Sequence, residues 1–214
     1  MTTSTFARRE RAALCATLRT TGPDAPTLCE GWSTKDLAAH IVIREHAPIG
    51  ALGIWARPLA GYTAKVQAEV AGQDWDTLLD QLAAPPALWH PARYSRWTEA
   101  VFDDAEMFIH HEDVRRGDGI PRPRDLSRDD QDSLWRVIKG PGRLAYRASP
   151  VGIAVEVPGH PRTELHRRGD TTVTVRGEVG EVLLAAYGRG RAAQVALDGR
   201  AEDLLALRET PLGL

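Results

Sequence analysis

The chain has 214 residues, which is long enough to bury a hydrophobic core without covalent cross-links, in one large domain or two modest ones. Its formal net charge of -2 and its 26% of charged residues give no global field that would favour nucleic acid or a membrane as a partner. Apolar stretches stop short of the roughly 20 residues that span a bilayer, and the N-terminus lacks a long apolar signal core, so we predict a cytoplasmic protein.

The first 140 residues carry helical patterns of apolar residues. The first helix is predicted from Ser4 to about Arg19, before the cluster Gly22-Pro23-Asp24. A second helix should begin at Ser33–Asp36, where a serine three residues ahead of an acid resembles a capping box. In chain order, the further helical patterns cover about Ile49–Trp55, Tyr62–Val70, Trp75–Leu82, Arg96–Arg116, which is the longest, and Leu126–Ile138.

The spacing of apolar residues changes from a helical to a strand-like pattern after Gly140-Pro141-Gly142, where we place a domain boundary. The run TTVTV at Thr171–Val175 alternates as a half-buried strand does. The other residues with strand character are Tyr146, Val151–Val157, Leu165 and Gln194–Leu197, and helical patterns cover Glu178–Tyr187 and Ala201–Leu207. We therefore predict a two-domain α+β protein, with a helical domain over residues 1–140 and a small α+β domain over residues 141–214.

The two cysteines are too few for a disulfide framework and lack the paired spacing of a zinc ribbon. We expect both Cys15 and Cys29 to be reduced thiols that are buried in helix packing.

Glu106 and His110 lie four residues apart in the longest predicted helix, so their side chains should share a face and reach a common ion. His111 lies about 100° further around the helix, so we prefer His110. Such pairs are also common as surface ion pairs, and that reading stays open. The apolar neighbours of the pair are Phe102, Ala105, Phe108 and Ile109. They predict a largely buried helix, in which a carboxylate must be paired, protonated or bound to a metal.

His40 lies in the apolar helical segment Leu37–Val42, where an imidazole is out of place. It either bonds a carbonyl in the core or joins Glu106 and His110 as a third metal ligand. Two nitrogens and one oxygen leave coordination positions open, as in catalytic rather than structural zinc sites. His46 is a further potential donor on the same predicted helix.

Polar neighbours of these residues are candidates to orient the imidazoles of a metal site and fix their tautomers. The candidates are Asp103, Asp113 and Glu45. For the two aspartates, salt links to Arg115 or Arg116 are an equally open reading.

The stretches Leu28–His40 and Glu106–Arg116 resemble the actinobacterial branch of the DinB-like metal-binding four-helix bundles. The nearest named group is the mycothiol-dependent maleylpyruvate isomerase family, in which an N-terminal bundle precedes a small α+β domain. Thr174–Glu178 and Leu183–Gly190 resemble the C-terminal domain of that family, so the resemblance covers nearly the whole chain.

The resemblance implies that His40, Glu106 and His110 bind a divalent metal, which is zinc in that family, and that mycothiol is the cosubstrate. Mycothiol is a low-molecular-weight thiol, and a divalent cation would lower its pKa and present a thiolate to a small electrophilic substrate. Arg189 is the candidate to hold a carboxylate or enolate of that substrate, because a guanidinium binds carboxylates bidentately. A solvent-facing arginine at a helix C-terminus is the other reading of Arg189.

Three functions follow from these observations. The leading one is a metal-dependent protein that uses mycothiol for S-transfer to, or isomerisation of, a small electrophile. The second is a non-catalytic metal-binding stress-response or ligand-binding protein. The third is metal-dependent hydrolysis with Glu45 or Asp103 as the base, although the sequence contains neither an H-E-x-x-H motif nor a nucleophile elbow.

Overall fold

The structure of the protein is a computed structural model that describes residues 5–47, 58, 60–210 and 212. The chain forms two compact units, Met1–Asp118 and Gly119–Leu214. The expected boundary after residue 140 instead falls inside the second unit. The reason is the helix α8 (Arg128–Lys139), which packs against α9 (Gly142–Ala145) and α10 (Val179–Ala186) of the same unit. Two independently folding domains remain a prediction.

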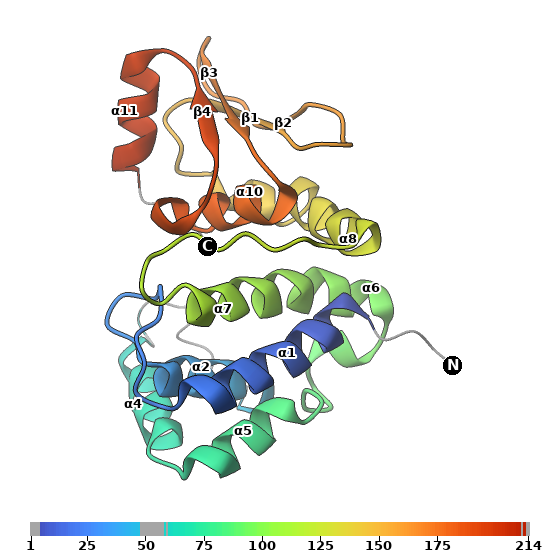
Figure 1. Ribbon diagram of the computed structural model, residues 1–214, viewed down its shortest axis with the longest axis vertical. Helices are drawn as coiled ribbons and strands as arrows, with labels where there is room; N and C mark the ends of the chain where they lie inside the picture. The colour runs from blue at the N-terminus through green and yellow to red at the C-terminus, as the bar shows by residue number, and fades with distance from the viewer. Residues whose placement is uncertain (1–4, 48–57, 59, 211, 213–214) are drawn as a thin grey trace. The chain divides into compact units, whose positions relative to one another are not determined.

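The described part of the first unit is helical (Figure 1). Its elements are α1 (Phe6–Thr21), α2 (Thr34–His46), α4 (Ala60–Ala71), α5 (Trp75–Ala83), the 3-10 helix η2 (Pro91–Arg93), α6 (Arg96–Glu99), the π-helical η3 (Ala100–Asp104) and α7 (Ala105–Arg115). The expected helix at Ile49–Trp55 lies outside the described residues. The expected helix from Arg96 is present, with a π-helical segment in its middle.

The ends of the first two helices follow the local signals in the sequence. Gly22 ends α1 with a positive φ of 83°, a conformation that glycine adopts without strain. At the start of α2, the Ser33 side chain accepts a hydrogen bond from the backbone of Asp36, and the Asp36 side chain accepts one from the backbone of Ser33. The predicted capping box is therefore confirmed.

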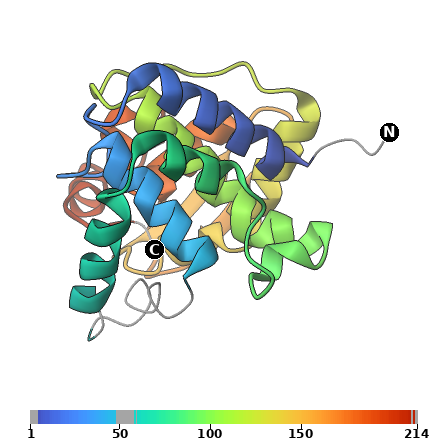
Figure 2. The ribbon, with the colours of Figure 1, turned by 90° about the horizontal axis from the view of Figure 1, so that it is seen from below.

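Four helices share one hydrophobic core. It contains Ala7, Leu14, Cys15 and Leu18 of α1, Leu37, Ala38, Ala39, Ile41 and Val42 of α2, Leu78, Leu79 and Leu82 of α5, and Met107 and Val114 of α7. In Figure 2, α1 and α2 lie on either side of α5, and contacts between these helices agree with that view. Burial of this apolar surface fixes the positions of α2 and α7, which carry the predicted metal ligands.

The second unit contains a small four-stranded sheet with the order β2-β1-β3-β4. Its elements after α9 are β1 (Gly152–Glu156), β2 (Thr163–His166), β3 (Thr172–Arg176), α10, the 3-10 helix η4 (Gly190–Ala192), β4 (Ala196–Asp198) and α11 (Ala201–Glu209). Strands β1 and β3 are parallel, and each has an antiparallel neighbour at its other edge. Figure 1 shows α8 and α10 side by side and α11 beside the sheet, where it contacts β3.

The helix-rich α+β composition with a small sheet is as predicted, with one local exception. Tyr146, which has strand character in the sequence, instead follows the short helix α9 and is 1% exposed. Its burial accounts for the apolar pattern there without a strand. Among the described residues, no helix is long and apolar enough to cross a bilayer.

Candidate metal centre

Packing of α2 against the other bundle helices brings His40 next to Glu106 and His110 of α7. The Nε2 atoms of His40 and His110 lie 3.6 and 3.2 Å from Oε1 of Glu106. The two imidazole rings are 5.3 Å apart between their centroids. One potential ligand atom from each residue lies within 4.8 Å of the other two, so a single ion can reach all three.

The shared carboxylate oxygen is the unusual atom of this cluster. Oε1 of Glu106 is buried and accepts no hydrogen bond from the residues that the structure describes. Leaving a buried acceptor without a partner costs roughly 1 to 3 kcal/mol, more for a charged group. A bound cation would satisfy this atom, so the residues present fit the divalent metal that the resemblance implies.

The positively charged guanidinium of Arg44 lies beside the same oxygen of Glu106. Its Nε atom is 3.3 Å from Oε1 of Glu106, and its Nη1 atom is 3.4 Å from a carboxylate oxygen of Asp103. Arg44 follows His40 by one helical turn on α2, which places both side chains on the same face.

The electrostatic setting separates the charges of the three predicted ligands. Burial would raise the pKa of Glu106, but the charges of Arg44 and His110 outweigh it and hold the pKa well below its usual range. Burial would lower the pKa of His110, but Glu106 and the hydrogen bonds from its other side raise it well above the usual value. Burial lowers the pKa of His40. Without a bound metal, these directions favour an ionised Glu106, a protonated His110 and a neutral His40.

The three predicted ligands are partly exposed to solvent. The side chains of His40, Glu106 and His110 are 14%, 22% and 10% exposed, whereas Asp113 behind His110 is fully buried. Among the described residues, the ligand side of the site is therefore partly exposed to solvent, whereas Asp113 is not.

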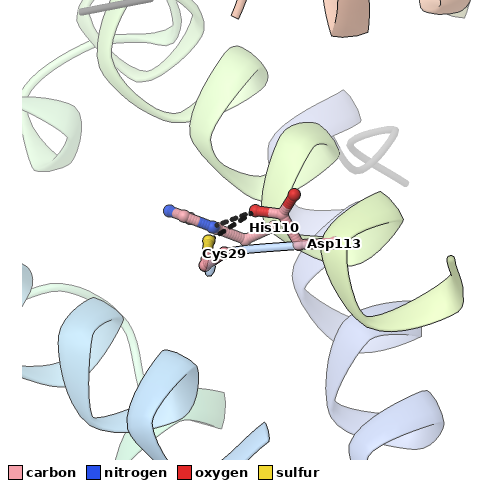
Figure 3. Close-up of side chains that lie close together, drawn as sticks. All are labelled: Cys29, His110 and Asp113. Carbon is pink, nitrogen blue, oxygen red and sulfur yellow. Dashed lines mark hydrogen bonds and ion pairs between the residues drawn. The ribbon is translucent and has the colours of Figure 1, made fainter. Parts of the chain in front are cut away.

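Cys29 and Asp113 lie at the rear of His110 (Figure 3). The Nδ1 atom of His110 is 3.0 Å from Oδ2 of Asp113, and the thiol of Cys29 donates to the same oxygen over 3.2 Å. Among the proposed orienting residues, Asp113 is the one with a described hydrogen bond to a predicted ligand. Cys29 lies half-buried in the loop before α2 and packs against the helical core, Cys15 is buried within that core as expected, and both cysteines are free thiols.

The loop that carries Cys29 is held against the end of α7. The N–H of Leu28 donates to the carbonyl oxygen of Asp113 over 3.0 Å. Gly117 permits this approach, because a Cβ atom there would lie 2.0 Å from the carbonyl oxygen of Pro26. At the other end of the loop, the Trp32 ring lies 5.0 Å from the His40 ring.

His111 faces away from the cluster, toward α1. Its Nδ1 atom is 2.9 Å from a carboxylate oxygen of Glu10, and its Nε2 atom is 2.9 Å from the hydroxyl of Thr17. Both ring nitrogens therefore have partners on another helix. His46, at the end of α2, does not belong to the cluster of three ligands.

The two other candidates for orienting the ligands are engaged with arginines. The carboxylate of Glu45 pairs with the guanidinium of Arg11 through contacts of 2.6 and 2.7 Å. Asp103 pairs with Arg44, whose guanidinium also lies beside Glu106. Neither carboxylate forms a described hydrogen bond to His40 or His110.

Arg189 belongs to the second unit, between α10 and η4. It is half-buried, and its Nη1 atom donates to the carbonyl oxygen of Tyr187 over 2.7 Å. Its role as a substrate anchor stays a prediction.

Sequence reasoning missed the part that Arg44 plays. The signal was present, because Arg44 follows His40 by four residues inside an apolar helix, the same spacing that relates Glu106 and His110. It also did not link Cys29 to Asp113, since only the folded loop brings the two residues together.

Comparison with solved structures identifies the fold. The crystal structure of the mycothiol-dependent maleylpyruvate isomerase superposes with a TM-score of 0.55 at 16% identity, and that of a histidine-to-alanine mutant of it with 0.60 at 17% identity. Each match covers 90% of this chain and 90% of the other. No protein-family model and no curated protein matches the sequence. The chain therefore has the fold of the mycothiol-dependent maleylpyruvate isomerase, which the two sequence stretches predicted.

Proposed function

We propose that this chain is a metal-dependent protein, with zinc as the metal, that uses a low-molecular-weight thiol such as mycothiol for S-transfer to, or isomerisation of, a small electrophile. The observation that carries the proposal is the convergence of His40, Glu106 and His110 around a buried carboxylate oxygen that accepts no described hydrogen bond. The fold, shared with a mycothiol-dependent isomerase, supports the choice of thiol chemistry.

The three side chains suit a divalent ion that keeps positions open for a thiol. Two imidazoles and one carboxylate form a typical ligand set of catalytic zinc. When bound, such an ion lowers the pKa of a coordinated thiol and so supplies a thiolate at neutral pH.

The remaining residues set the charge around the ligands. Arg44 keeps Glu106 ionised, so the carboxylate is ready to bind a cation. His40 is neutral and offers a lone pair without first losing a proton, whereas His110 must release one. The guanidinium of Arg189 is the group we assign to a carboxylate or enolate oxygen of the substrate.

The chemistry of isomerisation needs little more than these groups. A thiolate adds to one carbon of a cis double bond that is conjugated to a carbonyl, and the π electrons move to the carbonyl oxygen as an enolate. The former double bond then rotates as a single bond. Collapse of the enolate expels the thiolate and gives the trans isomer, with no net consumption of thiol. S-transfer to a halogenated electrophile uses the same addition, followed by loss of halide.

The test measures turnover with metal-loaded protein. A chlorinated aromatic electrophile, a bimane and maleylpyruvate are each offered with mycothiol, with cysteine and without thiol. We expect turnover only with mycothiol, and its loss in His110→Ala but not in His111→Ala. Zinc binding without turnover under any of these conditions would favour the non-catalytic metal-binding alternative. Turnover of an ester or amide without thiol would instead favour hydrolysis.

A further inference from the structure

The two ring nitrogens of His110 have separate carboxylate partners. Nε2 lies 3.2 Å from Oε1 of Glu106, on the open side of the site. Nδ1 lies 3.0 Å from Oδ2 of Asp113, on the closed side. Because both carboxylates come from α7, three and four residues from His110, the helix itself sets this arrangement.

Asp113 is held as a hydrogen-bond acceptor. Its side chain is fully buried, and Oδ2 accepts from the Cys29 thiol as well as facing His110. Its backbone carbonyl oxygen accepts from the N–H of Leu28, so the same residue binds the loop through both main chain and side chain. Figure 3 shows the thiol and the imidazole converging on one carboxylate oxygen.

We propose that Asp113 is a positioning residue that selects Nε2 of His110 as the metal-binding nitrogen. This inference rests on the proposed metal site. An ionised carboxylate only accepts hydrogen bonds, so the Nδ1 atom facing it carries the proton. The lone pair of a neutral His110 ring then lies on Nε2, directed toward Glu106 and His40. The hydrogen bond also fixes the ring orientation and makes Nε2 a stronger donor.

The same three residues have a competing reading as a metal site of their own. Potential ligand atoms of Cys29, His110 and Asp113 lie within 4.8 Å of one another. In the structure, however, the thiol and Nδ1 both already contact Oδ2 of Asp113. Of the carboxylate oxygens in these two clusters, the buried one without a described hydrogen bond belongs to Glu106, so the geometry favours the metal on the Nε2 side.

Two measurements on the full chain test the proposal. In zinc-loaded protein with nitrogen-15-labelled histidine, NMR should show Nδ1 of His110 protonated and Nε2 bound to metal. Zinc affinity, measured by competition with a chromophoric chelator, should fall roughly 10- to 100-fold in Asp113→Ala. The loss should be smaller in Asp113→Asn, whose amide oxygen still accepts a hydrogen bond.

The adjacent carboxylate provides the matched control. Glu112 is also fully buried on α7, but it pairs with Arg115 and Arg116, each over 2.5 Å. Glu112→Gln should therefore lower the thermal midpoint while zinc affinity stays at the wild-type value. Cys29→Ser keeps a donor to Asp113 and should also bind zinc normally.

The outcomes separate this inference from the proposed function. If the wild type binds no zinc, both are wrong. If it binds zinc and folded Asp113→Ala binds it equally well, only the role of Asp113 is wrong. A thiolate-to-cobalt charge-transfer band in cobalt-substituted protein that disappears in Cys29→Ser would place the metal on the Cys29 side and overturn the proposal. Should Asp113→Ala fail to fold, the protonation of His110 in the wild type decides by itself.

Discussion

The guanidinium Nε of Arg44 lies 3.3 Å from Oε1 of Glu106, the same carboxylate oxygen that the imidazoles of His40 and His110 approach. In metal-free protein this cation stabilises the carboxylate. When a divalent ion binds, two positive charges compete for one oxygen. For the proposed metal site we therefore expect Arg44 to lower metal affinity while it stabilises the metal-free fold.

Arg44→Met tests this competition. Without metal, the variant should lose about 3 to 5 kcal/mol of unfolding free energy, because a buried carboxylate is left without its partner. Saturating zinc should raise the unfolding free energy of the variant by more than it raises that of the wild type, since the ion no longer competes with a guanidinium for Glu106. Thermal unfolding with and without saturating zinc measures both effects.

Arg11→Met is the matched control for Arg44. Arg11 is a buried arginine that binds Glu45 and makes no described contact with Glu106. Its removal should destabilise the fold comparably and leave the zinc-dependent gain at the wild-type value. Equal zinc gains in the two variants would contradict the competition.

Substitution of the two adjacent histidines should separate metal binding from stability. His110→Ala should remove most of the bound zinc. His111→Ala should retain it but lose about 1 to 3 kcal/mol of stability, because Glu10 and Thr17 lose a buried partner. Elemental analysis and denaturant unfolding of both variants measure the two properties. Equal metal loss would show that the predicted ligand is the wrong histidine.

The raised pKa of His110 predicts opposite pH responses of metal-free and zinc-loaded protein. A raised folded-state pKa adds stability that is complete below the unfolded value of ~6.5 and is lost as pH rises through the folded-state value. The metal-free protein should therefore lose this contribution above about pH 6.5. Zinc requires the neutral ring, so zinc affinity should rise over the same range. Calorimetry in two buffers of different ionisation enthalpy should detect about one proton released per zinc; no release would contradict the assignment.

Asp103 should contribute a second pH dependence at lower pH. Burial raises the pKa of this carboxyl to about 7, although Arg44 opposes the shift. Its folded-state pKa exceeds the unfolded value, so stability from its proton is present below about pH 3.9 and is lost as pH rises to about 7. Asp103→Asn should remove this slope. Urea unfolding measures the unfolding free energy of metal-free wild type and variant at each pH across that range. Parallel plots of this free energy against pH would contradict the raised pKa of Asp103.

Gly117→Ala should displace the loop from the end of α7. The added Cβ would lie 2.0 Å from the carbonyl oxygen of Pro26, so the backbone has to move, at a cost of about 1 to 3 kcal/mol. Gly61→Ala is the matched control, because its Cβ would meet no atom within 4 Å and alanine favours the helix there. Thermal midpoints of the two variants should move in opposite directions. An unchanged midpoint in Gly117→Ala would show that the loop is not held at this glycine.

Local signals in the sequence were sufficient to predict where most of the described helices end. Gly22 and the Ser33–Asp36 capping box act within one turn of the chain, so their effect is visible without a fold. The membership of α8 in the second unit was not predictable in this way. Its apolar face, with Leu134 and Ile138 buried, shows that the helix packs but not which partner it packs against.

At the candidate site too, local features were predictable from the sequence and long-range contacts were not. The spacing of Glu106 and His110 along one helix was readable from the sequence, and His40 was conspicuous among apolar neighbours. The pairing of Cys29 with Asp113 joins residues that are 84 positions apart. No periodicity encodes such a contact, because it depends on how the loop before α2 meets the end of α7.

The π-helical segment Ala100–Asp104 immediately precedes the helix of Glu106 and His110. A π turn accommodates one residue more than an α turn, which is the outcome expected when a single residue is inserted into an existing α-helix. Deletion of one residue within this segment would restore α-helical winding and rotate the preceding residues by about 100° around the axis. Glu99 would then turn away from Arg8, with which it now pairs over 2.8 Å, while the two ligands downstream kept their places. The π-helical segment thus sets the rotation between the start of this helix, where Glu99 pairs with Arg8, and the part that carries Glu106 and His110.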